Sequence, residues 1–143
     1  MLPGIEADSL SGQATGLRWQ RVTQRAQFNA VLSAPPVAKT AHFALHAMAV
    51  ADSATRDLFV GHGPWIGVLI PKRWAKRAVT RNAIRRQIYA VSQDCAQPWA
   101  RQAVVVRLRS GFARQHFPSA TSEALRRAVR TELLRLFPGA RGE

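Results

Sequence analysis

The sequence predicts a two-layer α/β sandwich with the element order helix-strand-strand-strand-helix-strand-helix. Two pattern observations and one of composition lead to this fold class. Apolar residues recur at helical spacing in three segments, and they alternate with polar residues in others, as strands require. The chain has 143 residues, and 47% of them are hydrophobic, which is enough apolar material for the core of one domain.

The two ends of the chain differ in composition from its middle. Residues 1–16 are rich in glycine, serine and other small side chains, so we expect a disordered N-terminal leader. Residues 17–138 then form one α/β domain, followed by a tail at residues 139–143. The leader lacks the features of a secretory signal. The longest mostly apolar stretch, residues 41–51, is about half of the ~20 residues that a membrane span needs.

The first helix is expected at residues 23–32. Thr23 can cap its N-terminus, and the two prolines at residues 35–36 stop it. Phe28, Val31 and Leu32 fall on one side of this helix.

A strand is expected next, at residues 41–50, where polar and apolar side chains partly alternate. One face of this strand carries Phe43, Leu45 and Ala47, and the other carries His42, His46 and Met48.

A hairpin is expected at residues 58–70. Residues 58–60 and 65–70 are strand-like, and the breaker Gly61-His-Gly-Pro64 separates them.

The second helix follows Pro71 and a run of cations. Its core stripe is formed by apolar residues at helical spacing, namely Ile84, Ile88, Val91 and Cys95. The residues Asn82, Arg85, Arg86 and Tyr89 lie well around the helix from Ile84. One face of this helix is therefore expected to pack, and the other to bind.

The last strand and helix complete the sandwich. Residues 103–109 alternate, with Val104, Val106 and Leu108 on one side and Val105, Arg107 and Arg109 on the other. Ser119 or Thr121 can cap the final helix, and Pro138-Gly139 ends it. Its apolar stripe is Leu125, Ala128, Val129, Leu133, Leu136 and Phe137. The arginines Arg126, Arg127 and Arg130 lie outside and are read as a solvated face.

Charge is the feature that points most directly to a partner. The chain has 21 Lys and Arg against 8 Asp and Glu, for a formal net charge of +13. Residues 72–86, called here the basic segment, contain seven cations and no acid. Because residues 58–93 hold no Asp or Glu at all, the counter-charge should come from another molecule. Phosphate is the expected source.

The side chains offer no recognisable protein active site. The eight acids are scattered, so neither a carboxylate-bound metal centre nor a carboxylate pair is expected. His42 and His46 could share a strand face, but a structural role is favoured for both over acid–base catalysis. Cys95, the single cysteine, is read as a core thiol, and it fits a reducing compartment such as the cytoplasm.

Within the basic segment, a spaced signature is formed by Lys72-Arg73, Ala78, Arg81-Asn82 and Arg85-Arg86. This signature resembles that of the protein component of bacterial ribonuclease P, in its proteobacterial form. The resemblance extends over residues 17–137 through Arg21-Val-Thr23 with Phe28, through Phe43 with Leu45, and through Ile66-Gly-Val. The chain departs from the family pattern at Ala83, at Tyr89-Ala90, and at Leu32 and His46, which stand where the family often has aromatics.

The resemblance implies a fold with a left-handed crossover and an accessory role. In this family the RNA subunit is the catalyst and binds magnesium, so neither protein catalytic residues nor a protein-bound cofactor is expected. The protein would bind the ribonuclease P RNA and hold the 5′ leader of precursor tRNA in a cleft between the first helix and the sheet. The expected RNA-binding residues are Lys72, Arg73, Lys76, Arg77, Arg81, Asn82, Arg85 and Arg86. The expected leader-binding residues are Phe28, Phe43 and His46. No membrane partner is expected.

Two other function classes share this composition. A general RNA-binding or ribosome-associated module would look the same, although the Gly-x-x-Gly of KH domains and the aromatic strand signature of RRM domains are missing. A membrane-surface helix is disfavoured because the Ile84, Ile88 and Val91 stripe is narrow and suits a protein core. The four tryptophans are read as packing residues, and Trp74, flanked by cations, is also a candidate for stacking on RNA.

Overall fold

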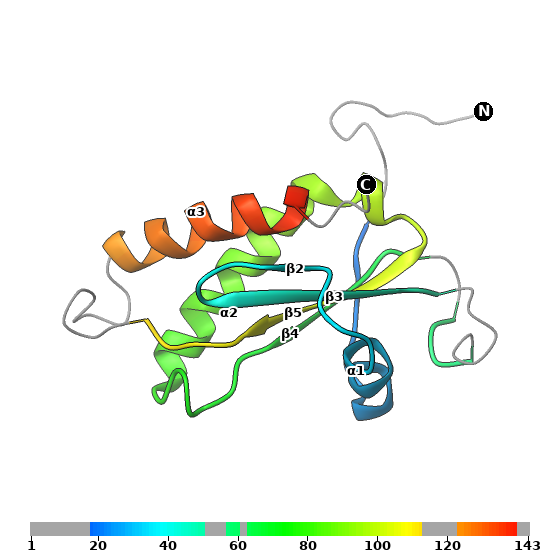
Figure 1. Cartoon of the computed structure of the whole chain (residues 1–143), viewed down its shortest axis with the longest axis horizontal. Helices are drawn as coiled ribbons and strands as arrows, with labels where there is room; N and C mark the ends of the chain where they lie inside the picture. The colour runs from blue at the N-terminus through cyan, green and yellow to red at the C-terminus, as the bar shows by residue number, and fades with distance from the viewer. Residues whose placement is uncertain (1–17, 51–56, 61–62, 113–122, 140–143) are drawn as a thin grey trace.

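The computed structural model describes residues 18–50, 57–60, 63–112 and 123–139. Five strands and three helices of at least two turns lie in this part of the chain (Figure 1). In chain order the elements are β1 (Gln20–Arg21), α1 (Arg25–Leu32), β2 (Ala38–Lys39), β3 (Phe43–Ala49), β4 (Trp65–Leu69), α2 (Ala78–Ser92), the 3₁₀ turns η1 (Gln93–Cys95) and η2 (Gln97–Trp99), β5 (Gln102–Leu108) and α3 (Glu123–Gly139).

The strands form one mixed sheet in the order β1-β4-β5-β3-β2. Strand β5 pairs antiparallel with β3, from Phe43 opposite Leu108 to Ala49 opposite Gln102. It pairs in parallel with β4, which pairs in parallel with β1. Two adjacent parallel strands need a long crossover, and α2 supplies it between β4 and β5. The handedness of this crossover stays a prediction.

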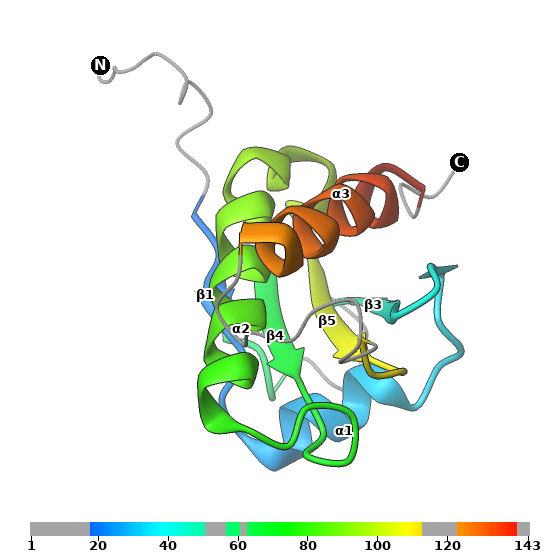
Figure 2. The same ribbon diagram turned by 90° about the vertical axis from the view of Figure 1, so that its left-hand side faces the viewer.

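The helices cover the two faces of the sheet unequally. Helices α2 and α3 lie over one face, and the shorter α1 lies against part of the other (Figures 1 and 2). Most of the predicted stripes of α2 and α3 is buried on the first face, where Ile84, Ile88 and Leu133 meet Val104 and Val106. Cys95, predicted to end the α2 stripe, lies beyond the helix in η1 and is only partly buried. On the second face Val31 packs with Val105 and Trp65. The α/β sandwich predicted from the sequence is therefore confirmed.

The predicted hairpin at residues 58–70 is wrong. Residues 58–60 are not a strand, although Phe59 is buried and its ring lies 5.4 Å from that of Trp65. Strand β4 has β1 on one side and β5 on the other, so both of its edges are occupied. A strand with two partners has no free edge for a hairpin neighbour.

The first helix begins one residue later than Thr23 would place it. Gln24 is its N-cap, with extended backbone angles. The cap is made by the side chain of Gln27, whose Oε1 accepts hydrogen bonds from the backbone N–H groups of Thr23 and Gln24, both at 3.0 Å. These two bonds satisfy donors that a helix start leaves unpaired. The Thr23 cap is therefore wrong, and a buried glutamine takes its place.

Three sequence predictions fall outside the described residues. They are the leader at residues 1–16, the caps at Ser119 or Thr121 and most of the tail at residues 139–143. Within the described residues, no helix has both the length and the apolar character that crossing a bilayer requires.

Candidate nucleic-acid interface

The basic segment folds as a tight loop followed by the first turns of α2. The backbone N–H groups of Trp74 and Ala75 donate to the Pro71 carbonyl at 3.0 and 3.3 Å, which turns the chain toward the helix. The buried methyl of Ala75 anchors the loop to the larger core. The loop is thus anchored to the core through Ala75, while its cations are exposed to solvent.

Arg81 connects this loop to the helix. One of its terminal nitrogens donates to the backbone carbonyls of Ala75 and Lys76, at 3.0 and 2.9 Å. Arg81 is half-buried, whereas Lys76 is exposed. A predicted RNA-binding residue therefore also has a structural function, because its guanidinium satisfies two carbonyls of the loop.

The start of α2 adds to the positive field. Its N-cap, Arg77, has extended backbone angles and makes no side-chain capping bond, and the first turn contains no acid. The N–H groups at the start of a helix point away from it, and the macrodipole places partial positive charge there. An anion at this end of α2 would meet backbone donors as well as arginines.

The predicted RNA-binding residues lie in the loop and in the N-terminal half of α2. Six of the eight are exposed, and Arg81 and Arg85 are half-buried. Arg85 donates to the side-chain oxygen of Asn82 at 2.8 Å, so this pair is already oriented. Among the described residues, the ion pairs join His42 and Glu132, and Glu123 with Arg126 and Arg127. The basic segment therefore has no carboxylate partner within the described part of the chain.

Two neutral residues of the segment occupy distinct positions. Ala83 is 8% exposed and lies on the packed side of α2, so in this chain it is a packing residue. Trp74 is 37% exposed, and the Arg73 guanidinium lies 5.3 Å from the centre of its ring. An exposed indole beside cations suits base stacking.

The predicted leader cleft is only partly assembled. Phe28 is partly buried on the α1 face of the sheet and covers Gly67, where an added Cβ would lie 2.8 Å from the Phe28 ring. A side chain at position 67 would displace that ring or the adjacent Val22. The glycine therefore allows α1 to sit close to β4.

His46 lies on the same face of the sheet as α1. Its Nδ1 is 2.9 Å from the Ala34 carbonyl, and its Nε2 is 3.4 Å from Nε of Arg107. Burial lowers the pKa of His46, and the charge of Arg107 lowers it further, although the bond to Ala34 opposes this shift. A neutral ring that donates from Nδ1 and accepts at Nε2 fits both neighbours. The alternation in β5 predicts this orientation of Arg107, but no local sequence pattern marks it as a candidate for binding.

Phe43 is not part of this face. It is fully buried among residues of the α2 and α3 core, on the opposite side of the sheet from Phe28 and His46. The prediction that Phe43 stacks on a leader nucleotide is therefore wrong. His42 is also displaced from its predicted face, because its ring bonds to Glu132 of α3 and stacks on Phe112 at 3.9 Å. The two histidines thus lie on opposite faces.

Within the described residues, the acidic side chains either bond to neighbouring groups of the protein or lie apart from one another. Within that part of the chain, no group of three or more His, Cys, Asp or Glu side chains gathers in a way that could hold a metal ion. Glu132 accepts hydrogen bonds from Thr40 and His42, and Glu123 pairs with arginines of its own helix.

Comparison with known proteins decides the family. The sequence model of the family Ribonuclease P matches residues 18–133 of the chain. The chain belongs to the ribonuclease P protein family. The resemblance of the basic segment to this family is thereby confirmed.

Two curated relatives and one solved structure are similar over most of the chain. The ribonuclease P protein component of Ralstonia pickettii (strain 12J) is 35% identical over 117 residues, which are 82% of this chain and 76% of the relative. That of Paraburkholderia xenovorans (strain LB400) is 28% identical over 94% of this chain and 89% of the relative. The structure of the Staphylococcus aureus RNase P protein has a TM-score of 0.59 and 16% identity, and the alignment covers 85% of this chain and 94% of that one. This last likeness supports the fold alone.

Proposed function

We propose that this protein is the protein subunit of a bacterial ribonuclease P, and that it promotes endonucleolytic removal of the 5′ leader from precursor tRNA in the cytoplasm. The observation that carries the proposal is the unneutralised cationic surface at the start of α2, in a chain of this family. Phosphates of the ribonuclease P RNA would supply the missing charge and release counterions on binding.

The proposed division of labour leaves the chemistry to the RNA. Magnesium bound to the RNA would supply the activation of water, and the protein would hold no metal of its own. The protein's contribution is to bring two polyanions together: its cations reduce the repulsion between the RNA subunit and precursor tRNA.

The leader would bind on the α1 face of the sheet. Phe28 offers a partly exposed ring for stacking, and Arg107 offers a cation within the same face. His46 would act as a hydrogen-bonding neighbour of Arg107 and not as an acid or base. Single-stranded RNA is commonly held by such combinations of a ring and nearby cations.

The proposal is tested by reconstitution. The full chain, mixed with a proteobacterial ribonuclease P RNA at low magnesium concentration, should restore leader cleavage that the RNA alone performs poorly under those conditions. The protein without RNA should cleave nothing. Cleavage by the protein alone would contradict the division of labour, and a failure to stimulate the RNA would contradict the subunit assignment.

The alternative, a general RNA-binding or ribosome-associated module, gives a different outcome in the same assay. Such a module would bind the RNA with a similar salt dependence but would leave the cleavage rate unchanged. The family match favours the first function.

A further inference from the structure

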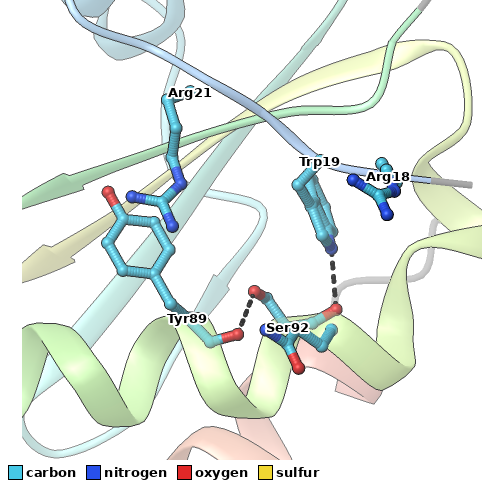
Figure 3. Close-up of a pocket in the computed structure, with 6 residues that line it drawn as sticks. Arg18, Trp19, Arg21, Tyr89 and Ser92 are labelled. Atoms are coloured by element: carbon cyan, nitrogen blue, oxygen red, sulfur yellow. Dashed lines mark hydrogen bonds between the residues drawn. The ribbon is translucent and has the colours of Figure 1, made fainter.

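A pocket of about 450 Å³ lies between β1 and the C-terminal half of α2, outside the predicted binding residues. Figure 3 shows the side chains that line it. The strand side supplies Arg18, Trp19 and Arg21, and the helix side supplies Tyr89, Ser92 and Gln93. A volume of this size is within the range of sites that accept a small molecule or one unit of a polymer.

The cations of the pocket are placed as an anion site requires. The guanidinium of Arg21 lies over the Tyr89 ring, 3.6 Å from its centre (Figure 3). The stack fixes the plane of the guanidinium while its N–H donors stay at the edge, where they can take a phosphate at two points. Arg18 and Arg21 are exposed, and among the described residues neither is paired with a carboxylate.

The floor of the pocket is held in place by hydrogen bonds. The indole Nε1 of Trp19 donates to the Ser92 carbonyl at 2.7 Å, and the Ser92 hydroxyl donates to the Tyr89 carbonyl at 2.9 Å. Ser92 is only 1% exposed. The first bond joins the segment before β1 to α2, and the second lies within α2. A ligand would therefore meet a site whose geometry already exists, and little ordering entropy would be lost on binding.

The pocket continues the cationic surface along the same helix. Arg85 and Tyr89 are four residues apart, so they lie on one side of α2, about 6 Å apart along its axis. A phosphate chain that contacts Arg85 therefore reaches the pocket within about one nucleotide spacing. We propose that this pocket is a second RNA subsite, in which Arg21, positioned by Tyr89, and Arg18 bind a backbone phosphate of the same RNA. This inference rests on the proposed function.

The first test measures RNA binding by the full chain with the substitutions Arg18→Gln and Arg21→Gln together. Binding to a ribonuclease P RNA is followed across a salt series by filter retention. We expect affinity to fall about 10-fold at moderate salt, and the slope of log K against log salt to fall by about one to two phosphate equivalents. The matched control is Arg130→Gln with Arg135→Gln on the exposed side of α3, which removes the same charge.

The outcomes separate this inference from the proposed function. If the wild-type protein binds no RNA, the proposed function fails. If the wild type binds and Arg85→Ala weakens binding, but the pocket variant behaves like the α3 control, the second subsite is wrong. Equal losses in the pocket and control variants would show a general effect of charge and would also overturn it.

The positioning role of Tyr89 has its own test. Tyr89→Phe keeps the ring under Arg21 and should bind RNA like the wild type. Tyr89→Leu removes the stack and should lower RNA affinity and the salt slope as much as Arg21→Gln does. The double variant with both substitutions should show no further loss. Thermal unfolding of each variant reports whether it is folded. A folded Tyr89→Leu variant with wild-type binding would contradict the role.

Crosslinking shows whether the RNA is physically there. A photoreactive group on Gln93→Cys, in a Cys95→Ser background, should crosslink to the bound RNA. The same group on Arg135→Cys should not. Crosslinks from an Arg85→Cys control without any from position 93 would place the RNA elsewhere and refute the subsite.

Discussion

Glu132 illustrates how one buried carboxylate joins two elements. From α3 it accepts hydrogen bonds from the Thr40 hydroxyl and the backbone N–H of His42, and its second oxygen lies 2.9 Å from Nδ1 of His42. Burial alone would raise the pKa of Glu132, but the hydrogen bonds from Thr40 and His42 outweigh it and hold this pKa below the usual 4.5. The ionised form is therefore the one that the fold stabilises.

Replacing this carboxylate should change the acid dependence of stability. A group whose pKa is lower in the folded state stabilises the fold above its unfolded pKa, and this stabilisation is lost as the pH falls through the folded pKa. We expect Glu132→Gln to lower the free energy of unfolding by about 1–3 kcal/mol at pH 7. The difference should shrink below the ordinary glutamate pKa of 4.5. Urea denaturation at several pH values measures both, and a difference independent of pH would contradict this account.

Phe28 is the residue on which the leader cleft now mainly depends. Its ring is partly buried against Gly67, and Leu32 of the same helix is partly buried in the same cluster. We expect Phe28→Ala to weaken binding of precursor tRNA by about 1–3 kcal/mol per lost stack, and to leave mature tRNA binding nearly unchanged. Leu32→Ala is the matched control for lost packing. Equal losses for both RNAs, or for both variants, would make Phe28 a plain core residue.

At the scale of elements, the predictability of each segment follows from where its contacts lie. Helix α2 was predictable because its stripe of Ile84, Ile88 and Val91 is a local pattern. Strands β1 and β2 have two residues each, and they exist only because distant partners pair with them. A period-two pattern cannot be seen in two residues, so these strands were missed.

The proposed binding surfaces also differ in how far a local sequence pattern predicts them. The basic segment was predictable because its residues are contiguous and without acids in the sequence. The leader cleft was not, because its face depends on where α1 packs. Phe43 and Phe28 were both aromatic candidates, but Phe43 is an odd number of residues from His46 and so points to the other face of β3. The pocket beside Tyr89 joins residues about 70 positions apart, and no local pattern announces it.

Within the loop and α2, Arg81 and Arg85 should respond differently to substitution. Arg81 donates to two loop carbonyls, whereas Arg85 donates to the side-chain oxygen of the exposed Asn82. We expect Arg81→Ala to lower the unfolding free energy by about 1–2 kcal/mol as well as RNA affinity. Arg85→Ala should reduce the salt slope by about one phosphate with little change in stability. Urea denaturation of the two variants measures their unfolding free energies, and RNA binding across a salt series measures their salt slopes. Equal unfolding free energies for the two variants would contradict the structural role of Arg81.

At the scale of the whole molecule, the two faces of the sheet have different roles: one carries the larger apolar core, and the other carries the proposed leader cleft. Helices α2 and α3 seal one face with the larger apolar cluster, which supplies the rigid support for the basic segment and for the β1–α2 pocket. On the other face α1, with eight residues, is the one helix within the described residues, and Phe59 packs on Trp65 in the same apolar cluster. The smaller apolar cluster thus lies on the side of the proposed leader cleft. Of the three proposed RNA surfaces, the basic segment and the pocket lie on α2, and the leader cleft lies on the opposite face of the sheet.

The net charge of +13 predicts opposite salt effects on the free and the RNA-bound protein. Repulsion among its cations destabilises the free protein. Added salt weakens this repulsion, and at 0.1 M it largely screens exposed charges that are more than about 10 Å apart. We therefore expect the unfolding free energy of the free protein to rise by about 1–2 kcal/mol from low to moderate salt. RNA-bound protein gains stability from binding, and because salt weakens binding this gain should fall over the same range. Thermal unfolding with and without RNA measures the two trends, using a labelled protein so that RNA melting does not interfere. A free protein whose stability falls as salt is added would mean that its cations are already neutralised internally, which would remove the physical reason for an RNA partner.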